Sequence, residues 1–218
     1  MTNWQAETNC FNEYSPIKLL AVRSAAHAFA SDNRLDRDWE SLRYHNRPEL
    51  QFAIEEYRDF IKIIQSHGAN LVNLHHHENL TLDSIYPRDA LIVSPAGLIL
   101  CNMGRQSRNH EPGINAAQLE NAGFPIAGTI EPPGTVEGGD FIWLDATNAA
   151  IGEGPRTNEE GIRQLQKLLG LKVELHVVPL PAPDHPDDVF HLMSMISPVD
   201  ADLAVIYRPL MPESFLSW

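Results

Sequence analysis

The sequence is short of cysteine, of basic residues and of long apolar runs, and each shortage excludes a class of protein. The two cysteines, Cys10 and Cys101, are too few for a disulfide framework and are typical of a reducing compartment. Sixteen basic residues against 29 acidic ones give a formal charge of -13, which argues against nucleic acid as the main partner. No run approaches the roughly 20 apolar residues of a membrane helix, and the polar N-terminus is unlike a signal peptide. We therefore expect a cytoplasmic protein without nucleic-acid or membrane partners.

What is present indicates a folded α/β chain, because 43% of its 218 residues are hydrophobic and periodic segments alternate along it. Residues 17–22 and 69–74 are predicted strands, separated by a polar loop and by a helix that begins near Arg47, after a cap at Asn46, and ends at Gly68. Beyond them the order strand, strand, helix, strand recurs. Its expected members are 90–94, 98–102, 115–121 and 124–130, then 141–144, 149–152, 158–169 and 172–180, and finally 192–197 and 203–207.

Three polar residues mark the start of these units. Asp89, Asp140 and His191 each come just before the first strand of a unit, and successive members are 51 residues apart. Repeats of this length stack or close into a ring, because one unit cannot bury its apolar face alone. Equivalent strand ends then converge near the axis, so these side chains are natural site candidates.

The third unit contains two expected strands but no returning strand. After Tyr207, residues 211–218 resemble the opening turns of a helix. A protein that stopped there would expose apolar surface and strand edges. We therefore expect residues 1–218 to form a single incomplete domain, completed by a further C-terminal segment or by self-association.

Two acidic stretches can carry chemistry. In residues 132–140, Glu137 and Asp140 flank two glycines that allow close backbone approach, and the carboxylates can face a cationic ligand. An acidic hairpin turn is the alternative. In residues 82–89, Asp83 and Asp89 lie on either side of a Pro-Arg pair, with a solvated loop as the alternative.

Two further stretches add a cation and an imidazole. In residues 152–158, Arg156 can hold a carboxylate by a bidentate fork, whereas Thr157 or Asn158 can simply cap the following helix. In residues 187–192, His191 adjoins an apolar strand and several acids, where it can be structural or act as a general acid or base.

Together these four stretches resemble the guanidino-group-modifying superfamily of amidinotransferases, arginine deiminases and dimethylarginine dimethylaminohydrolases. The resemblance runs from about Asn12-Glu13-Tyr14 to the last residue, with four motifs in order, and the dimethylarginine dimethylaminohydrolase branch is the most similar. It implies a five-bladed α/β propeller of the pentein type, built of strand-strand-helix-strand modules, of which this chain holds about the first three-fifths. It also implies a small guanidino substrate and no metal or organic cofactor.

The resemblance assigns roles to the polar residues around the repeat positions. Glu137 matches the acid that binds the guanidinium and assists proton transfer, and His191 matches the general acid and base. Asp89 matches the second guanidinium-binding carboxylate, and Asp140 and Asn158 are expected to support these groups.

Three more residues match positions that hold the rest of the substrate. Asp83 matches the acid that binds its amino group. Arg108 and Arg156 match the arginines that bind its carboxylate, with Arg105 in the same loop as the alternative to Arg108.

In the family a cysteine thiolate attacks the guanidinium carbon and forms a covalent thiouronium species. That nucleophile lies in a Gly-rich segment near the family's C-terminus, and neither cysteine here matches it, because Cys101 is expected in the core and Cys10 lies in a polar arm. We therefore expect a parent hydrolase of a substituted arginine, with amidino transfer or arginine deimination as alternatives, and no turnover by this chain alone. The alternative of another class is a catalytically silent protein that binds arginine analogues or a partner.

Two groups of metal-ligand types stand apart from these motifs. His75, His76 and His77 are consecutive, so their side chains are expected to diverge rather than chelate together. The second group lies in a Pro-rich stretch around Asp184 and His185, where an exposed loop explains it equally well. We predict no metal site.

Overall fold

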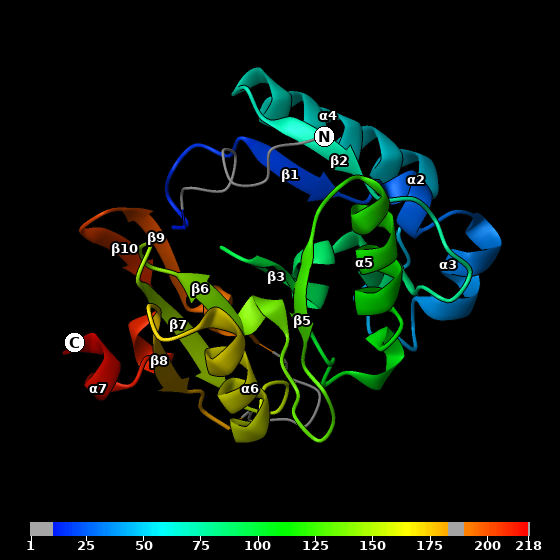
Figure 1. The fold of residues 1–218 in the computed structure, drawn as a ribbon. Helices are drawn as coiled ribbons and strands as arrows, with labels where there is room; N and C mark the ends of the chain where they lie inside the picture. The colour runs from blue at the N-terminus through cyan, green and yellow to red at the C-terminus, as the bar shows by residue number, and fades with distance from the viewer. Residues whose placement is uncertain (1–10, 183–189, 218) are drawn as a thin grey trace. The chain divides into compact units, whose positions relative to one another are not determined.

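The computed structural model describes residues 11–182 and 190–217, and the chain divides into two compact units (Figure 1). The first unit, here the modular unit, comprises Met1–Ser15, Arg88–Arg105 and Pro125–Trp218. The second, the helical unit, comprises Pro16–Pro87 and Gln106–Phe124. Both contain helices and strands, so the fold is mixed α/β as expected.

The modular unit contains the predicted repeat as two three-stranded sheets of identical order. In each sheet the first two strands are antiparallel, and the third strand pairs parallel with the second. The strands are β3 (Leu91–Ser94), β4 (Gly97–Leu100) and β5 (Ile126–Thr129) in one sheet, and β6 (Phe141–Trp143), β7 (Asn148–Glu153) and β8 (Glu174–Pro179) in the other. Helix α6 (Glu159–Leu169) connects β7 to β8, as the periodicity predicts.

The third copy of the pattern begins later than predicted. Leu192–Ser194 form a short 3-10 helix, η5, and the strand β9 (Ile196–Asp200) starts only after it, antiparallel to β10 (Leu203–Ile206). The prediction of a strand over 192–197 was wrong at its start, because an apolar run fits a buried turn as well as a strand. The chain then passes through η6 (Arg208–Leu210) to α7 (Glu213–Leu216).

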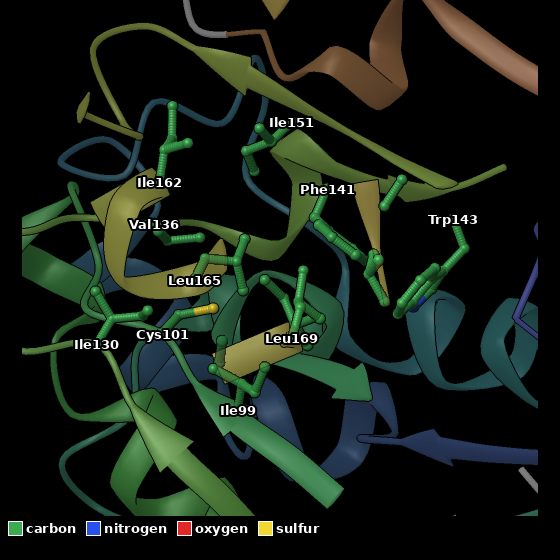
Figure 2. Close-up of a cluster of buried hydrophobic side chains, with 14 of the residues drawn as sticks. Ile99, Cys101, Ile130, Val136, Phe141, Trp143, Ile151, Ile162, Leu165 and Leu169 are labelled. Carbon is green, nitrogen blue, oxygen red and sulfur yellow. The ribbon is translucent and has the colours of Figure 1, made fainter. Parts of the chain in front are cut away.

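The core of the modular unit lies between the two three-stranded sheets and α6 (Figure 2). Side chains from both sheets and from the inner face of α6 interdigitate there. Its members include Ile99, Cys101, Ile130, Val136, Phe141, Ile151, Leu165 and Leu169. Burial of each large aliphatic side chain of this kind contributes about 1.5–3 kcal/mol, which holds the strand starts in fixed positions.

The helical unit consists of one parallel strand pair and several helices. Strands β1 (Leu19–Val22) and β2 (Asn70–Asn73) pair in parallel, close to the predicted bounds. The helical segments are α2 (Ala25–Ala28), α3 (Asp32–Asp38), α4 (Leu50–Ser66), α5 (Glu111–Asn121), η1 (Leu82–Ile85) and η3 (Gln106–Arg108). No helix among the described residues is both long and apolar enough to cross a membrane.

Two predictions for the helical unit were wrong. The expected polar loop after β1 holds α2 and α3, whose N-caps Ser24 and Ser31 accept the backbone N–H groups of His27 and Arg34. Helix α4 begins at Leu50 with Glu49 as its cap, and not at Arg47 after Asn46. The residue before a proline avoids helical backbone angles, so Pro48 keeps Arg47 out of the helix.

Candidate active site

Polar side chains from three loops of the modular unit meet at the starts of β6 and α6 and before η5. Glu137 precedes η4 (Gly138–Asp140), and Asp140 ends it directly before β6. Arg156 and Thr157 come from the loop between β7 and α6, and His191 is the N-cap of η5. The loops are held by the sheets behind them, so these side chains project from rigid elements.

Asp140 and His191, two of the three repeat positions, are in direct contact. The Nδ1 atom of His191 lies 3.2 Å from Oδ1 of Asp140, which also accepts the backbone N–H of Leu192 at 3.2 Å. The other oxygen of Asp140 accepts the hydroxyl of Thr157 at 2.7 Å. Because an ionised carboxylate can only accept, Nδ1 carries the proton, and Nε2 is the atom of His191 that can exchange one.

Glu137 is fully buried and surrounded by donors. Its carboxylate accepts the backbone N–H of Arg105 at 2.8 Å, and Nη1 of Arg156 lies 3.1 and 3.2 Å from its two oxygens. The Nε2 atom of His191 is 3.5 Å from Oε2 of Glu137. A buried carboxylate is costly unless it is paired and hydrogen-bonded, so these contacts are what allow Glu137 to sit there.

His191 holds its proton more tightly than an ordinary histidine. Burial alone lowers its pKa, but the hydrogen bond to Asp140 and the negative charges of Asp140, Asp89 and Glu137 raise the pKa by more. The side chain is still 17% exposed, so a leaving group or water can reach it. A buried histidine that is still reachable can both donate and accept a proton in one cycle.

Gly139 permits the close approach of Asp89, the remaining repeat position. A Cβ atom at Gly139 would lie 2.7 Å from ring carbons of His191 and 2.8 Å from Oδ1 of Asp89, closer than real contacts allow. Asp89 is buried, and the preceding Arg88 donates to both carboxylate oxygens of Glu13 at 3.1 and 2.9 Å. The glycine pair of this loop therefore serves packing around the site, beyond its role in a turn.

Asn158 caps α6 and ties the loop before Glu137 to it. Its Oδ1 accepts the backbone N–H groups of Gly161 at 2.8 Å and Thr135 at 2.9 Å, and its Nδ2 donates to the carbonyl of Pro133 at 2.9 Å. The sequence left Thr157 and Asn158 as equal candidates for this cap. The structure gives the cap to Asn158, while Thr157 bridges Asp140 and the backbone N–H of Glu137.

Asp83 and Arg108 belong to the helical unit. Both are buried, and the guanidinium of Arg108 donates to the two carboxylate oxygens of Glu111 at 2.8 and 2.7 Å and to the carbonyls of Asp83 and Tyr86. Sequence reasoning missed Glu111, because the helix was predicted only over 115–121, whereas α5 begins at Glu111. The six other predicted residues, and Arg105, lie in the modular unit.

Cys101 does not have the surroundings of a nucleophile. Figure 2 shows its sulfur among the apolar side chains of the core, and the residue is fully buried. Burial raises the pKa of the thiol well above its usual range, and the charges of Glu137, Asp89 and Asp140 raise it further. The thiol therefore stays protonated and unreactive. Cys10 lies outside the described residues.

The three consecutive histidines make three different kinds of contact. His76 Nδ1 lies 3.0 Å from the carbonyl of His27, His77 Nδ1 lies 3.2 Å from the backbone N–H of Asn79, and the ring of His75 packs edge-on against that of His27. Within 11–182 and 190–217, no cluster of three His, Cys, Asp or Glu residues is placed to hold a metal ion. The stretch around Asp184 and His185 lies outside the described residues.

Comparison with known sequences identifies relatives of this chain. A family model described as N,N dimethylarginine dimethylhydrolase, eukaryotic, matches residues 23–214. The N(G),N(G)-dimethylarginine dimethylaminohydrolase of Pseudomonas aeruginosa is 30% identical over 123 residues, which are 56% of this chain and 48% of that protein. The alignment thus spans about half the length of the curated relatives it matches.

Solved structures share the fold. The dimethylarginine dimethylaminohydrolase from Pseudomonas aeruginosa, a cysteine-to-serine mutant complexed with citrulline, superimposes with a TM-score of 0.72 at 24% identity, over 94% of this chain and 75% of that one. An amidinotransferase of the saxitoxin biosynthetic pathway from Microseira wollei gives a TM-score of 0.73 at 16% identity, over 96% and 74% of the two chains. At these identities the likeness concerns the fold alone.

Proposed function

The chain belongs to the N,N-dimethylarginine dimethylhydrolase family, and on this premise we propose that its parent protein hydrolyses a C–N bond of a substituted arginine or a related guanidine. The observation that carries the proposal is the state of Glu137. This buried carboxylate already holds a guanidinium, that of Arg156, and it faces Nε2 of His191 at 3.5 Å. Such a position can bind a substrate guanidinium beside a proton donor.

The chemistry of the guanidinium explains why these groups are needed. It is a planar, delocalised cation that resists nucleophilic attack, so a site must fix its N–H groups and protonate the departing amine. In our proposal Glu137 and Asp89 bind the N–H groups, and His191 protonates the leaving nitrogen. Asp140 keeps the proton on Nδ1 of His191, and Asn158 positions the loop of Glu137.

The proposed reaction runs through a thiol. A thiolate attacks the guanidinium carbon and forms a C–S bond, and the C–N bond breaks as His191 gives its proton to the amine. Water then attacks the thiouronium carbon, His191 takes a proton from it, and the C–S bond breaks to return the thiolate. The burial of Cys101 supports a nucleophile other than this thiol, and we propose that residues 1–218 alone bind without turnover.

The same proposal extends to the fold and the location. The two modules of identical strand order, followed by the β9–β10 pair, support a five-bladed propeller of strand-strand-helix-strand modules. The low cysteine content supports a cytoplasmic location. Expression of the complete natural gene and cell fractionation test these two points.

Further contacts with the substrate are proposed from the family resemblance. Asp83 is assigned to its amino group, and Arg156 and Arg108 to its carboxylate, with Arg105 as the alternative to Arg108. Replacement of each arginine by alanine decides between Arg105 and Arg108. The carboxylate ligand is the one whose loss weakens binding of L-arginine but not of L-argininamide, which lacks the carboxylate.

Calorimetric titration of the 218-residue chain with L-arginine and its Nω-methylated forms tests the proposal. We expect saturable binding, weakened at least about tenfold in Glu137→Gln, because that change removes the charge that pairs with the guanidinium. The matched control is Glu160→Gln, a partly exposed glutamate paired with Arg163 outside the site, which should bind as the wild type does. Equal affinities of wild type and Glu137→Gln would contradict the proposed site.

Two alternatives are separated by products. An amidinotransferase would pass the amidino group to an added amine, and an arginine deiminase would release ammonia instead of an alkylamine. The buried Cys101 also favours a silent binding protein. The protein purified from its natural source should release an alkylamine from methylated arginine, whereas binding without any product would establish the silent alternative.

A further inference from the structure

Arg156 is the feature of the site that the family roles do not explain. Its assigned partner is the carboxylate of a substrate, yet its Nη1 lies 3.1 and 3.2 Å from the two oxygens of Glu137. The side chains are 13% and 0% exposed, so the pair is largely removed from water. In this conformation Arg156 occupies the carboxylate that the substrate guanidinium needs.

The main chain of Arg156 is fixed, so an exchange of partners must come from its side chain. A Cβ atom at Gly104 would lie 2.7 Å from Cα and from the carbonyl oxygen of Arg156, which shows how tightly the two backbones pack. Thr157, the next residue, is held by its bonds to Asp140 and to the backbone N–H of Glu137. The long stem of an arginine can still rotate from such an anchored Cα.

The number of buried ion pairs depends on which ligand enters the site. A guanidinium that displaces Arg156 from Glu137 leaves the arginine cation, in a poorly hydrated place, without its anion. A ligand that also carries a carboxylate gives Arg156 a new bidentate partner, so one buried ion pair is replaced by two. The affinity of the site should therefore depend on the guanidinium and the carboxylate of the ligand together.

Resting on the function proposed above, we propose that the Arg156–Glu137 pair is an ion-pair exchange filter that selects guanidino acids over guanidines without a carboxylate. In this role Arg156 determines specificity in two ways. It competes with every ligand guanidinium for Glu137, and it binds the carboxylate of those ligands that carry one. Asp140 and Thr157 hold the loop in place during the exchange.

The test uses two ligands that differ in one charged group. L-Arginine and L-argininamide share the guanidinium and the amino group, and only arginine has the carboxylate. Their affinities for the 218-residue chain are measured by calorimetry at constant ionic strength. The variants are Arg156→Ala and Arg156→Lys, with Arg163→Ala as the control, because Arg163 is an exposed arginine that pairs with Glu160 on α6.

The wild type should prefer arginine to argininamide by at least about tenfold, the ratio that corresponds to about 1.4 kcal/mol. In Arg156→Ala, argininamide should bind more tightly than to the wild type, by about fivefold or more, because Glu137 is no longer occupied. Arginine should lose affinity, so the preference falls toward unity. Arg156→Lys should retain part of the preference, since lysine keeps the charge but not the bidentate fork, and Arg163→Ala should retain all of it.

The outcomes separate this inference from the function on which it rests. If Arg156→Ala lowers the affinity for arginine and leaves that for argininamide unchanged, Arg156 is a plain carboxylate ligand, and the exchange is refuted while the guanidine site stands. If neither ligand binds to the wild type or to either Arg156 variant, the proposed function and the filter fail together. Arg156→Lys keeps the test decisive if Arg156→Ala does not fold.

Discussion

At the scale of single residues, buried charges hold one another in place around His191. Glu137 and Asp140 are both inaccessible to solvent, and each has at least three donors within hydrogen-bonding or ion-pairing distance. Thr157 links the two, because it donates to Asp140 and accepts from the backbone of Glu137. Loss of one member leaves the next without a partner, and the cost of an unpaired buried charge then exceeds the value of the lost bond.

The raised pKa of His191 predicts a pH-dependent contribution to stability. Since the folded-state pKa lies above the unfolded value of about 6.5, protonated His191 stabilises the fold fully below that pH, and the contribution is lost as the pH rises through the folded-state pKa. In His191→Gln, the loss of unfolding free energy should be largest in mildly acidic buffer and should shrink as the pH increases. Urea denaturation of wild type and variant across this range measures the difference.

Asp140→Asn is the control for this prediction. It removes the main charge and hydrogen bond that raise the pKa of His191, so burial dominates and the stabilisation by the protonated form should disappear. A variant His191→Gln whose stability loss is the same at every pH, or grows with pH, would contradict the assignment of a raised pKa.

At the scale of elements, α6 and the loop before Glu137 form one structural piece. The helix has a buried face in the modular core, and its cap Asn158 holds the loop through Thr135 and Pro133. The start of α6 therefore helps to fix the position of the loop that carries Glu137. A capping interaction of this kind connects secondary structure directly to the geometry of the site.

Removal of the Asn158 cap should lower the free energy of unfolding. Asn158→Ala loses the bond to Gly161 and both bonds to the loop, so we expect a destabilisation of about 1–2 kcal/mol, at the upper end of measured cap losses. Asn109→Ala is the control, because Asn109 is exposed and its amide donates to Gln106, and it should change stability by less than about 0.5 kcal/mol. Equal midpoints in urea for the two variants would show that Asn158 does not tie the loop.

At the scale of the whole molecule, the β9–β10 pair exposes apolar side chains. Among the described strands these two pair with each other alone, and Leu203 and Val205 are 60% and 63% exposed. Exposed strand edges with apolar side chains are templates for pairing with another chain. The 218-residue chain is therefore expected to self-associate through this sheet.

A lysine on this sheet should suppress the association. Val205→Lys places a charge on the exposed strand, which opposes both edge pairing and apolar contact, so the monomer fraction in sedimentation velocity should rise at equal concentration. Leu171→Lys is the control, since Leu171 is fully exposed but lies in the turn between α6 and β8, outside the β9–β10 pair. If wild type and Val205→Lys sediment identically as monomers, the β9–β10 sheet is not an association surface.

The sequence determined those features that depend on near neighbours and on regular spacing. Hydrophobic periodicity and glycine stops located α6 and the strands of both modules to within a few residues, and the 51-residue spacing identified Asp140 and His191 as equivalent positions that meet. Short elements escaped it. The serine-capped helices α2 and α3 carry too few apolar residues for a periodic signal, and the apolar start of η5 fits either a turn or a strand.

Only the tertiary structure decided which charged groups pair. Glu137 and Arg156 lie 19 residues apart, and neither local sequence indicates that they meet, because the contact depends on the pairing of β6, which follows Glu137, with β7, which precedes Arg156. The same is true of Thr157 between Asp140 and Glu137, and of the burial that keeps Cys101 unreactive. Spacing and composition set the kinds of groups available, whereas desolvation and distance, which set their chemistry, exist only in the folded chain.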